Sequence, residues 1–322
     1  MKKGLLIIAL CSISLNSFCW GFYAHQKINY FAVFLLPPEM MVFFKPNIQF
    51  LSDHAVDPDK RRYAVKDEAP KHYIDIDYYG KYPYDSLPRK YDDAVKKYTL
   101  DTITENGIVP WWIQIMQQRL TNAFKEKNEA KILKYAAEIG HYIADSHVPL
   151  HASSNHDGQN SNQKGIHGFW ESRVPELLAE KEFDFMIGKA LYIKNIPDYA
   201  WQRVLESGAA SDTVLRYEAE LTKKFPSDKK YSFEERNGKI IRQYSSDFTT
   251  AYDRMLNGMV ERRMRLAIAS VASFWYTAWV NAGQPDLKKL KQIAFSEEDL
   301  KEFDNLNASW KSGSVKGRPH DQ

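Results

Sequence analysis

Apolar residues recur at helical spacing along several stretches of the chain. Within 28–36 they fall at i, i+3, i+4, i+7 and i+8, which is one face of a helix, and Pro37 ends the pattern. Helical patterning returns at 111–125 and at 130–146. A further stripe begins near residue 252 and predicts one helix over 252–280.

The remaining segments complete a fold prediction. Residues 47–100 are rich in Asp, Pro and Tyr and indicate loops, whereas an Asn-Gly pair between two short β-like runs predicts a hairpin within 231–245. The apolar run at 266–280 is too short for an integral membrane span and indicates a core helix. We therefore expect an all-α, single multi-helix domain over 20–307, followed by a disordered tail at 308–322.

The first residues resemble an export signal. A basic start (MKK) precedes the apolar run GLLIIALCSI, and Ser17 and Cys19 provide small side chains before a cut at residue 20. We predict that 1–19 is a cleaved signal peptide and that the protein is exported, to the periplasm or outside the cell. The alternative is a lipoprotein lipidated at Cys11 or Cys19, which is disfavoured because a large residue precedes each cysteine.

Loss of the leader changes the composition. Both cysteines are removed, so the remaining chain has no disulfide framework, and its length is sufficient to bury a core without one. The formal charge falls from +3 to 42 − 41 = +1 when the two leader lysines are removed. A dedicated nucleic-acid binder usually has a strong basic excess, so that class is disfavoured, although an enzyme that handles nucleotides locally is not excluded.

Candidate metal chemistry concentrates at 140–172, where five of the nine histidines lie. His141 and Asp145 are one helical turn apart, on a helix that is apolar on its other faces as well. A buried carboxylate beside an imidazole requires compensation, which a cation supplies. His167 and Glu171 repeat the spacing, with His151 between the pairs, and these are ligand types that zinc prefers. The alternative is a pair of surface turns with incidental histidines.

Taken together, these motifs resemble the superfamily of zinc-dependent phospholipases C and single-strand nucleases. "WGFYAH" is similar to that family's W-G-x-x-x-H start, "LSDHAVDPDKRR" supplies the expected aspartate, and "KHYIDID" supplies the remaining histidine. The resemblance implies an all-helical enzyme with three zinc ions, one of them bound through the free amino and carbonyl groups of an N-terminal tryptophan. The implied ligands are Trp20, His25, Asp53, His72, His141, Asp145, His151, His167 and Glu171.

The resemblance also implies how these ligands are shared. The first zinc would have Asp53, His72, His141 and Asp145, the second Trp20 and His25 with Asp145 as a bridge, and the third His151, His167 and Glu171. A zinc-bridging hydroxide would attack the phosphate, and the third zinc would polarise a phosphoryl oxygen or stabilise the leaving alkoxide. Asp53 is the candidate catalytic residue, because it would orient or deprotonate the water.

The substrate is less narrowly determined. Glu171 as the last ligand, a short loop before His167 and the lack of cysteines resemble the phospholipase C branch. The close Trp20–His25 spacing and a Tyr73/Asp75 pair, placed to stack on and contact a base, resemble the nuclease branch. Alternatively, those two residues only pack and support the neighbouring histidine.

We predict a phospholipase C-like phosphodiester hydrolase acting on a phospholipid. The first alternative is a single-strand nuclease or 3′-nucleotidase acting on single-stranded nucleic acid or nucleotides, and the second is a non-catalytic zinc-binding protein. The protein is expected to be a monomer.

Overall fold

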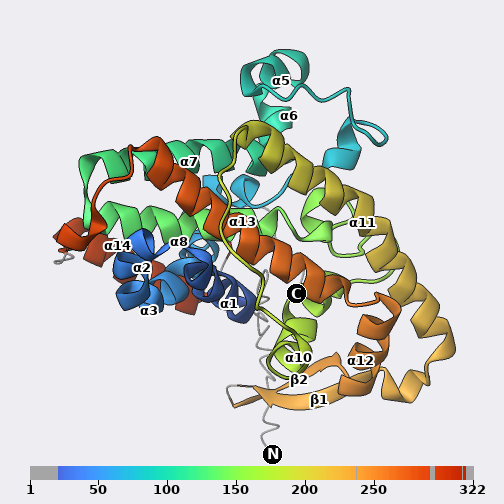
Figure 1. The fold of residues 1–322 in the computed structure, drawn as a ribbon. Coiled ribbons are helices and arrows are strands. Elements are labelled where there is room, and N and C mark those ends of the chain that lie inside the picture. The colour runs from blue at the N-terminus through green and yellow to red at the C-terminus, as the bar shows by residue number, and fades with distance from the viewer. Residues whose placement is uncertain (1–20, 237, 291–293, 314, 317–322) are drawn as a thin grey trace, which may run out of the picture.

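Helices carry almost all of the regular structure. The computed structural model describes residues 21–236, 238–290, 294–313 and 315–316. The α-helices of these residues are α1 Phe22–Ala32, α2 Pro38–Phe44, α3 Ile48–Asp53, α4 Asp57–Arg61, α5 Tyr91–Tyr98, α6 Leu100–Glu105, α7 Val109–Glu126, α8 Glu129–Asp145, α9 Ile166–Gly168, α10 Val174–Glu182, α11 Ile196–Lys224, α12 Ser246–Met255, α13 Met259–Asn281 and α14 Glu297–Ser312 (Figure 1). The predicted all-α fold is confirmed. The predicted leader and Trp20 lie outside the described residues.

Helix α8 is the central helix, in agreement with its all-round apolar pattern. Every residue from Ala136 to Asp145 is buried, and the helix packs against α1, α3, α7 and α13. Asn29 of α1 donates to the carbonyl of Ala137 at 3.0 Å, and it lies so close to Gly140 that a Cβ there has no room. The close approach of α1 and α8 brings the first turn of α1 beside the last turn of α8.

The helix predicted over 252–280 is two helices. Asn257 and Gly258 adopt left-handed φ angles of 52° and 69°, which end α12 and begin α13. Left-handed φ is incompatible with a continuing α-helix, and Asn and Gly are the residues that adopt it most readily. The apolar run at 266–280 lies within α13 as a core helix. Within the described residues, none of the helices has both the length and the apolar content that a bilayer crossing requires.

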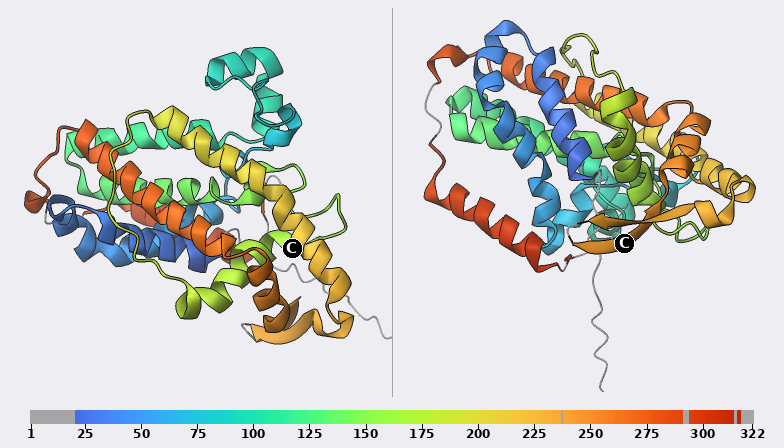
Figure 2. Two further views of the ribbon diagram at one scale, coloured as in Figure 1. Left: turned by 45° about the vertical axis from the view of Figure 1, so that its right-hand side comes forward. Right: turned by 90° about the horizontal axis from the view of Figure 1, so that it is seen from below.

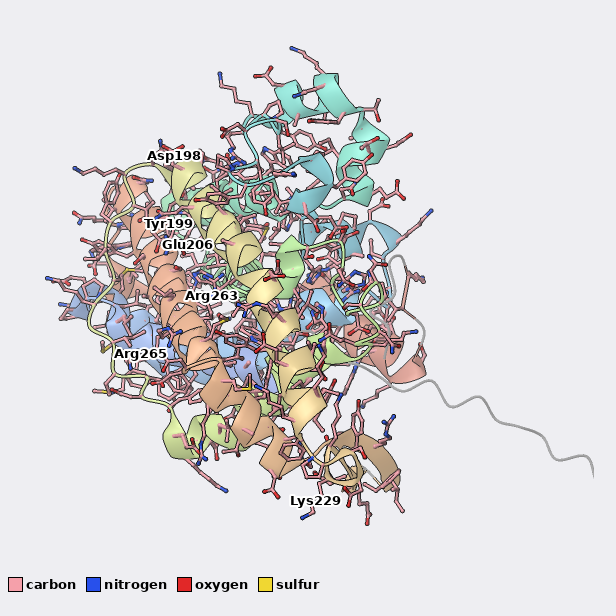
Figure 3. The ribbon with its side chains drawn as sticks, turned by 90° about the vertical axis from the view of Figure 1, so that its right-hand side faces the viewer. Asp198, Tyr199, Glu206, Lys229, Arg263 and Arg265 are labelled. Carbon is pink, nitrogen blue, oxygen red and sulfur yellow. The ribbon has the colours of Figure 1, made fainter. Side chains whose placement is uncertain are left out.

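Helix α11 is a long element that the apolar pattern does not predict. It spans 29 residues, and Figure 3 shows it running beside α13, with Glu206 on one helix and Arg263 on the other. Polar contacts join α11 to its neighbours: Ser207 Oγ donates to the Ser146 carbonyl at 2.7 Å, and Arg263 Nη1 lies 3.7 Å from Glu206 Oε2. Because buried polar groups interrupt its apolar stripe, the helical period is weak in the sequence.

A hairpin packs beside the segment that carries Glu171. Strand β1 (Tyr231–Arg236) pairs antiparallel with β2 (Lys239–Tyr244), as predicted for 231–245, and Figure 1 shows the pair next to α10 and α12. Tyr244 is buried, and its ring stacks on Phe169 with centroids 3.8 Å apart. Phe169 begins a π-helical turn, Phe169–Arg173, which contains Glu171. The hairpin therefore supports one of the candidate ligands from behind.

Helix α14 corrects the predicted boundary of the tail. It extends to Ser312, so residues 308–312 are helical rather than disordered. Ser296 and Asp299 form a reciprocal capping box at its start, and Gly313 ends it with a φ of 82°. Figure 2 shows α14 at the edge of the molecule, where it packs on α4. The local caps fix where the helix begins and ends, and its contacts with α4 fix where it lies.

Candidate metal centre

Asp145 is the point at which the first ligands meet. Its two carboxylate oxygens face different histidines: Oδ2 lies 3.0 Å from His72 Nδ1 and 3.3 Å from His141 Nε2. Oδ1 lies 3.4 Å from His25 Nε2. All four residues are buried. A carboxylate that directs one oxygen to each of two groups of imidazoles is arranged to bridge two cations.

A second group lies next to the first. His167 Nε2 is 3.1 Å from Glu171 Oε2, and His151 Nε2 is 3.4 Å from the same oxygen. The expected i, i+4 geometry is achieved across a junction between α9 and the π turn rather than within one α-helix. Such π turns occur frequently at functional sites. His151 also approaches Asp145, with Nδ1 3.8 Å from Oδ1, so the two groups are neighbours.

Backbone carbonyls orient three of the imidazoles. His141 Nδ1 donates to the Ala55 carbonyl at 2.8 Å, and His151 Nδ1 donates to the His72 carbonyl at 2.6 Å. His167 Nδ1 donates to a third carbonyl, that of His156, at 2.9 Å. Donation from Nδ1 leaves the Nε2 lone pair directed at the carboxylates, which is the tautomer that a metal ligand needs.

The charges of the cluster suit a cation. Burial on its own would lower the pKa of His141, but the carboxylates of Asp145 and Asp59 outweigh burial and raise that pKa to about 9. Burial would raise the pKa of Glu171, whereas His167 beside it lowers that pKa to about 2. Metal binding replaces the protons that such imidazoles otherwise carry.

Orphaned oxygens give an independent test of the fit. Both carboxylate oxygens of Asp59 and both of Glu171 are buried and have no hydrogen-bond partner among the described residues. Buried carboxylate oxygens without partners are costly unless a cation is bound. Nitrogen and oxygen donors brought together in small groups match the preferences of zinc, so these residues fit it. Three groups have candidate ligand atoms within 4.8 Å of one another: His25, His141 and Asp145; Asp59, His72 and His141; His151, His167 and Glu171.

The structure does not bring Asp53 to this cluster. Asp53 is exposed at the end of α3, where it accepts from Gln49 Nε2 at 2.8 Å. Asp59, in α4, takes the expected place instead: it is buried, and its Oδ1 lies 3.6 Å from His141 Nε2 and 3.8 Å from His72 Nδ1. A 3₁₀ turn at His54–Val56 redirects the chain between the two aspartates, which turns the second inward.

The two aspartates give opposite predictions. Asp59→Asn should lower the affinity for the zinc at His72 and His141 by more than about 100-fold, because loss even of an outer partner of a ligand costs 10–100-fold. Asp53→Asn is the matched control and should leave zinc affinity unchanged. Chelator competition followed by metal analysis measures both. Unchanged zinc affinity in Asp59→Asn, with a loss in Asp53→Asn, would restore the sequence-based assignment.

Two further carboxylates, those of Glu68 and Asp157, lie near the cluster. Glu68 is fully buried, accepts from Lys71 Nζ at 2.7 Å and lies 3.7 Å from His72 Nε2. Asp157 accepts from the backbone nitrogens of Gly165 at 3.0 Å and His167 at 3.2 Å, which fixes the start of α9. Glu68 precedes His72 by four residues, and this spacing could have indicated from the sequence that the two side chains lie close together.

His147 faces away from the metal groups. Its Nδ1 donates to the Ile143 carbonyl at 2.8 Å, and its Nε2 lies 3.1 Å from Ser270 Oγ. Burial and the guanidinium of Arg263 lower its pKa well below the usual range, so the ring is neutral. It joins the turn that follows α8 to α13.

A cavity of about 810 Å³ lies on the segment that follows His72. Tyr73 and Asp75, the predicted substrate-binding residues, both line it, and the Tyr73 hydroxyl donates to the Glu105 carbonyl at 3.0 Å. The amide of Ile74 donates to the His151 carbonyl at 2.9 Å, so this short segment is fixed between the metal groups and the cavity. The remaining lining residues, which were not predicted, are Lys66, Asp67, Ala69, Pro70, Tyr78, Asp101, Thr104, Glu105 and Asn106.

Comparison with known proteins identifies the family. The family model for the S1/P1 nucleases matches residues 20–267, which is most of the chain. No relative was found among the curated proteins. The match begins at the tryptophan of the W-G-x-x-x-H motif and includes the metal groups described above. The chain therefore belongs to the S1/P1 nuclease family, within the superfamily of zinc-dependent phospholipases C and P1 nucleases, and is a zinc-dependent phosphoric ester hydrolase.

Proposed function

We propose that the protein is a single-strand nuclease or 3′-nucleotidase with three zinc ions. The observation that carries the proposal is the arrangement of Asp145, whose oxygens face two different groups of histidines beside a third group. The proposed ligands are Asp59, His72, His141 and Asp145 for one zinc; the Trp20 amino and carbonyl groups and His25, with Asp145 shared, for the second; and His151, His167 and Glu171 for the third.

The residues have separate tasks in phosphodiester hydrolysis. When bound, zinc supplies Lewis-acid polarisation of the phosphoryl group and an activated water. Asp145 fixes the spacing of two neighbouring positions, because its oxygens point to different imidazoles. Asp59, buried among the same ligands, takes over the role that the sequence assigned to Asp53: its carboxylate orients the water or accepts the proton.

The nuclease branch receives more support than the phospholipase C branch that the sequence analysis favoured. The matching family is that of the S1/P1 nucleases. The residues that line the cavity include Tyr73, Asp75 and Asn106, which carry an aromatic ring, a carboxylate and an amide. Stacking together with hydrogen-bond donors and acceptors suits a nucleobase, whose phosphate would then lie towards the metal groups.

One observation favours a second candidate, a phospholipase C for lipids with a cationic head group. The described residues that line the cavity include four carboxylates, from Asp67, Asp75, Asp101 and Glu105, and one ammonium group, from Lys66. A negatively charged cavity with tyrosine rings suits a quaternary ammonium group. It is less suited to a long polyanion, so a nuclease with this cavity would favour short substrates.

Export belongs to the same proposal. We infer that 1–19 is removed as a signal peptide, because the family match begins at residue 20 and S1/P1 nucleases are generally secreted. Removal would free the Trp20 amine for zinc. We further infer that the active protein is a monomer.

Substrate assays test the proposal directly. Protein that begins at Trp20 should release 5′-nucleotides from single-stranded RNA or DNA, and a chelator should abolish this release. Phosphatidylcholine vesicles assayed in parallel would release phosphocholine if the second candidate were correct. If the zinc-bound protein hydrolysed none of these substrates, the alternative of a non-catalytic zinc-binding protein would remain.

Tyr73 provides a mutational test of base recognition. Tyr73→Ala should raise KM for nucleic acid by roughly tenfold or more, because stacking contributes about 1–3 kcal/mol per base. Tyr73→Phe keeps the ring, so its KM should stay near that of the unmodified enzyme. Tyr82→Ala, at an exposed tyrosine that does not line the cavity, is the control. If steady-state kinetics showed that Tyr73→Ala changes kcat but not KM, the result would argue against stacking at this position.

A further inference from the structure

Helix α14 contacts two segments that carry candidate zinc ligands, although it lies beyond the family match. The match ends at residue 267, and α14 spans Glu297–Ser312. Figure 2 shows it on the outside of the helical bundle. Its C-terminal end reaches the start of α1, and its middle reaches α4 and α8.

The first contact is aromatic. The ring of Trp310 lies against Phe22, with centroids 5.2 Å apart and planes inclined by 43°. Phe22 is the first residue of α1, and His25 follows one helical turn later. Restraint of Phe22 therefore restrains the turn of α1 that presents His25.

The second contact is a chain of alternating charges. Glu302 Oε1 lies 3.3 Å from Arg61 Nη2, and Arg61 Nη1 lies 3.6 Å from Glu68 Oε1. Glu68 Oε1 in turn lies 3.7 Å from His72 Nε2, on the side of the ring opposite Asp145. Arg61 also forms an ion pair with Glu138 of α8, so its guanidinium is held between three carboxylates.

Additional contacts fix α14 in place. Lys134 of α8 donates to Asp299 at 2.8 Å and to Glu302 at 2.7 Å. Beyond the helix, the Lys316 amide donates to the Arg62 carbonyl at 2.8 Å. The helix is thus tied to α8 at its start, to α8 and α4 at its middle, and to Arg62, directly after α4, beyond its end.

We propose that α14 is a positioning element for the metal centre, with Trp310 and Glu302 as its positioning residues. Trp310 holds the N-terminal segment at the His25 zinc, and Glu302 orients Arg61 and Glu68 behind His72. The proposal rests on the proposed zinc assignment. It extends the centre to a part of the chain outside the family match, and it requires that loss of each side chain weakens one zinc rather than all three.

Zinc retention is the test, because it does not depend on catalysis. Trp310→Ala should raise the Kd of one zinc about tenfold, in the range found for outer partners of ligands, and Trp310→Phe should restore it. Lys311→Ala, at the exposed neighbouring residue, is the matched control. Glu302→Gln should weaken a different single zinc by several-fold, with exposed Glu298→Gln as its control. Chelator titration followed by metal analysis measures how tightly each equivalent of zinc is bound. The unfolding temperature of each zinc-free variant measures its stability without metal.

The outcomes separate positioning from mere stability. Selective loss of one equivalent, with an unchanged unfolding temperature of the zinc-free protein, supports the proposal. Unchanged zinc retention, or equal loss of all equivalents together with a lower unfolding temperature, would overturn it. A protein that binds zinc but hydrolyses no phosphodiester would contradict the proposed function while leaving this test intact.

Discussion

Replacement of Asp145 by asparagine should remove two zinc ions together and reduce hydrolysis by about 10³-fold or more. Each oxygen of Asp145 faces a different group of imidazoles, so one substitution removes a ligand from two positions. Metal ions contribute several kcal/mol to transition-state stabilisation, and 1.36 kcal/mol corresponds to a tenfold change in rate. Metal analysis of the purified variant, together with kcat on single-stranded RNA, measures both effects.

A matched control separates this role from the general cost of altering a buried carboxylate. Glu218 is also buried, but it belongs to none of the three metal groups and bonds to Gln163 and Tyr244, so Glu218→Gln should keep all its zinc. Circular dichroism of zinc-free Asp145→Asn checks that the helices are intact. Loss of no more than about half an equivalent of zinc from Asp145→Asn would contradict the bridging role.

A blocked N-terminus should have the second largest effect. Protein that carries an additional methionine before Trp20 should lose one zinc and most of its activity, because an amide nitrogen lacks the lone pair that a free amine offers. The neighbouring backbone is fixed where this ligand would be required. The Gly21 amide donates to Ser172 Oγ at 3.0 Å, directly after Glu171, and a Cβ on Gly21 would lie 2.7 Å from that oxygen.

The tryptophan side chain can be separated from the amine. Trp20→Ala in a protein that begins at residue 20 keeps the amino and carbonyl groups, so it should retain the zinc that the extended form loses. Proteolytic removal of the additional methionine should restore zinc and activity together. Three equivalents of zinc and full rates in the extended form would rule out the N-terminal ligand.

The parts of the site that the sequence predicts are those in which a ligand pair lies one turn apart. His141 and Asp145 share a face of α8 whatever surrounds the helix, and His167 and Glu171 meet even across a π turn. Asp59 could not be chosen in this way. Three aspartates occur within seven residues there, and the direction of each depends on one short 3₁₀ turn. Asp53 was selected from the motif and faces solvent.

Long-range contacts determine the features that the sequence does not predict. The cavity is lined by residues from α6, from loops and from short 3₁₀ turns, and the turn that carries Ala69 and Pro70 packs on α7. Helix α14 takes its place from Trp310 and Glu302, neither of which contributes to a helical period. The break at Asn257-Gly258, in contrast, could have been predicted, because Asn-Gly is a turn signal. It was missed because the apolar stripe continues on both sides of the dipeptide.

The ligand set also has a topological consequence for a chain whose two cysteines both lie in residues 1–19. Zinc held by His25, Asp59, His72 and Asp145 would close loops of tens to more than a hundred residues between α1, α4 and α8. Closure of long loops restricts the unfolded ensemble most, so the ions would act as the cross-links that disulfides provide in many secreted proteins. Each ion that is withdrawn would open the loops that it closes, so the resistance of the chain to proteases would follow the local supply of free zinc.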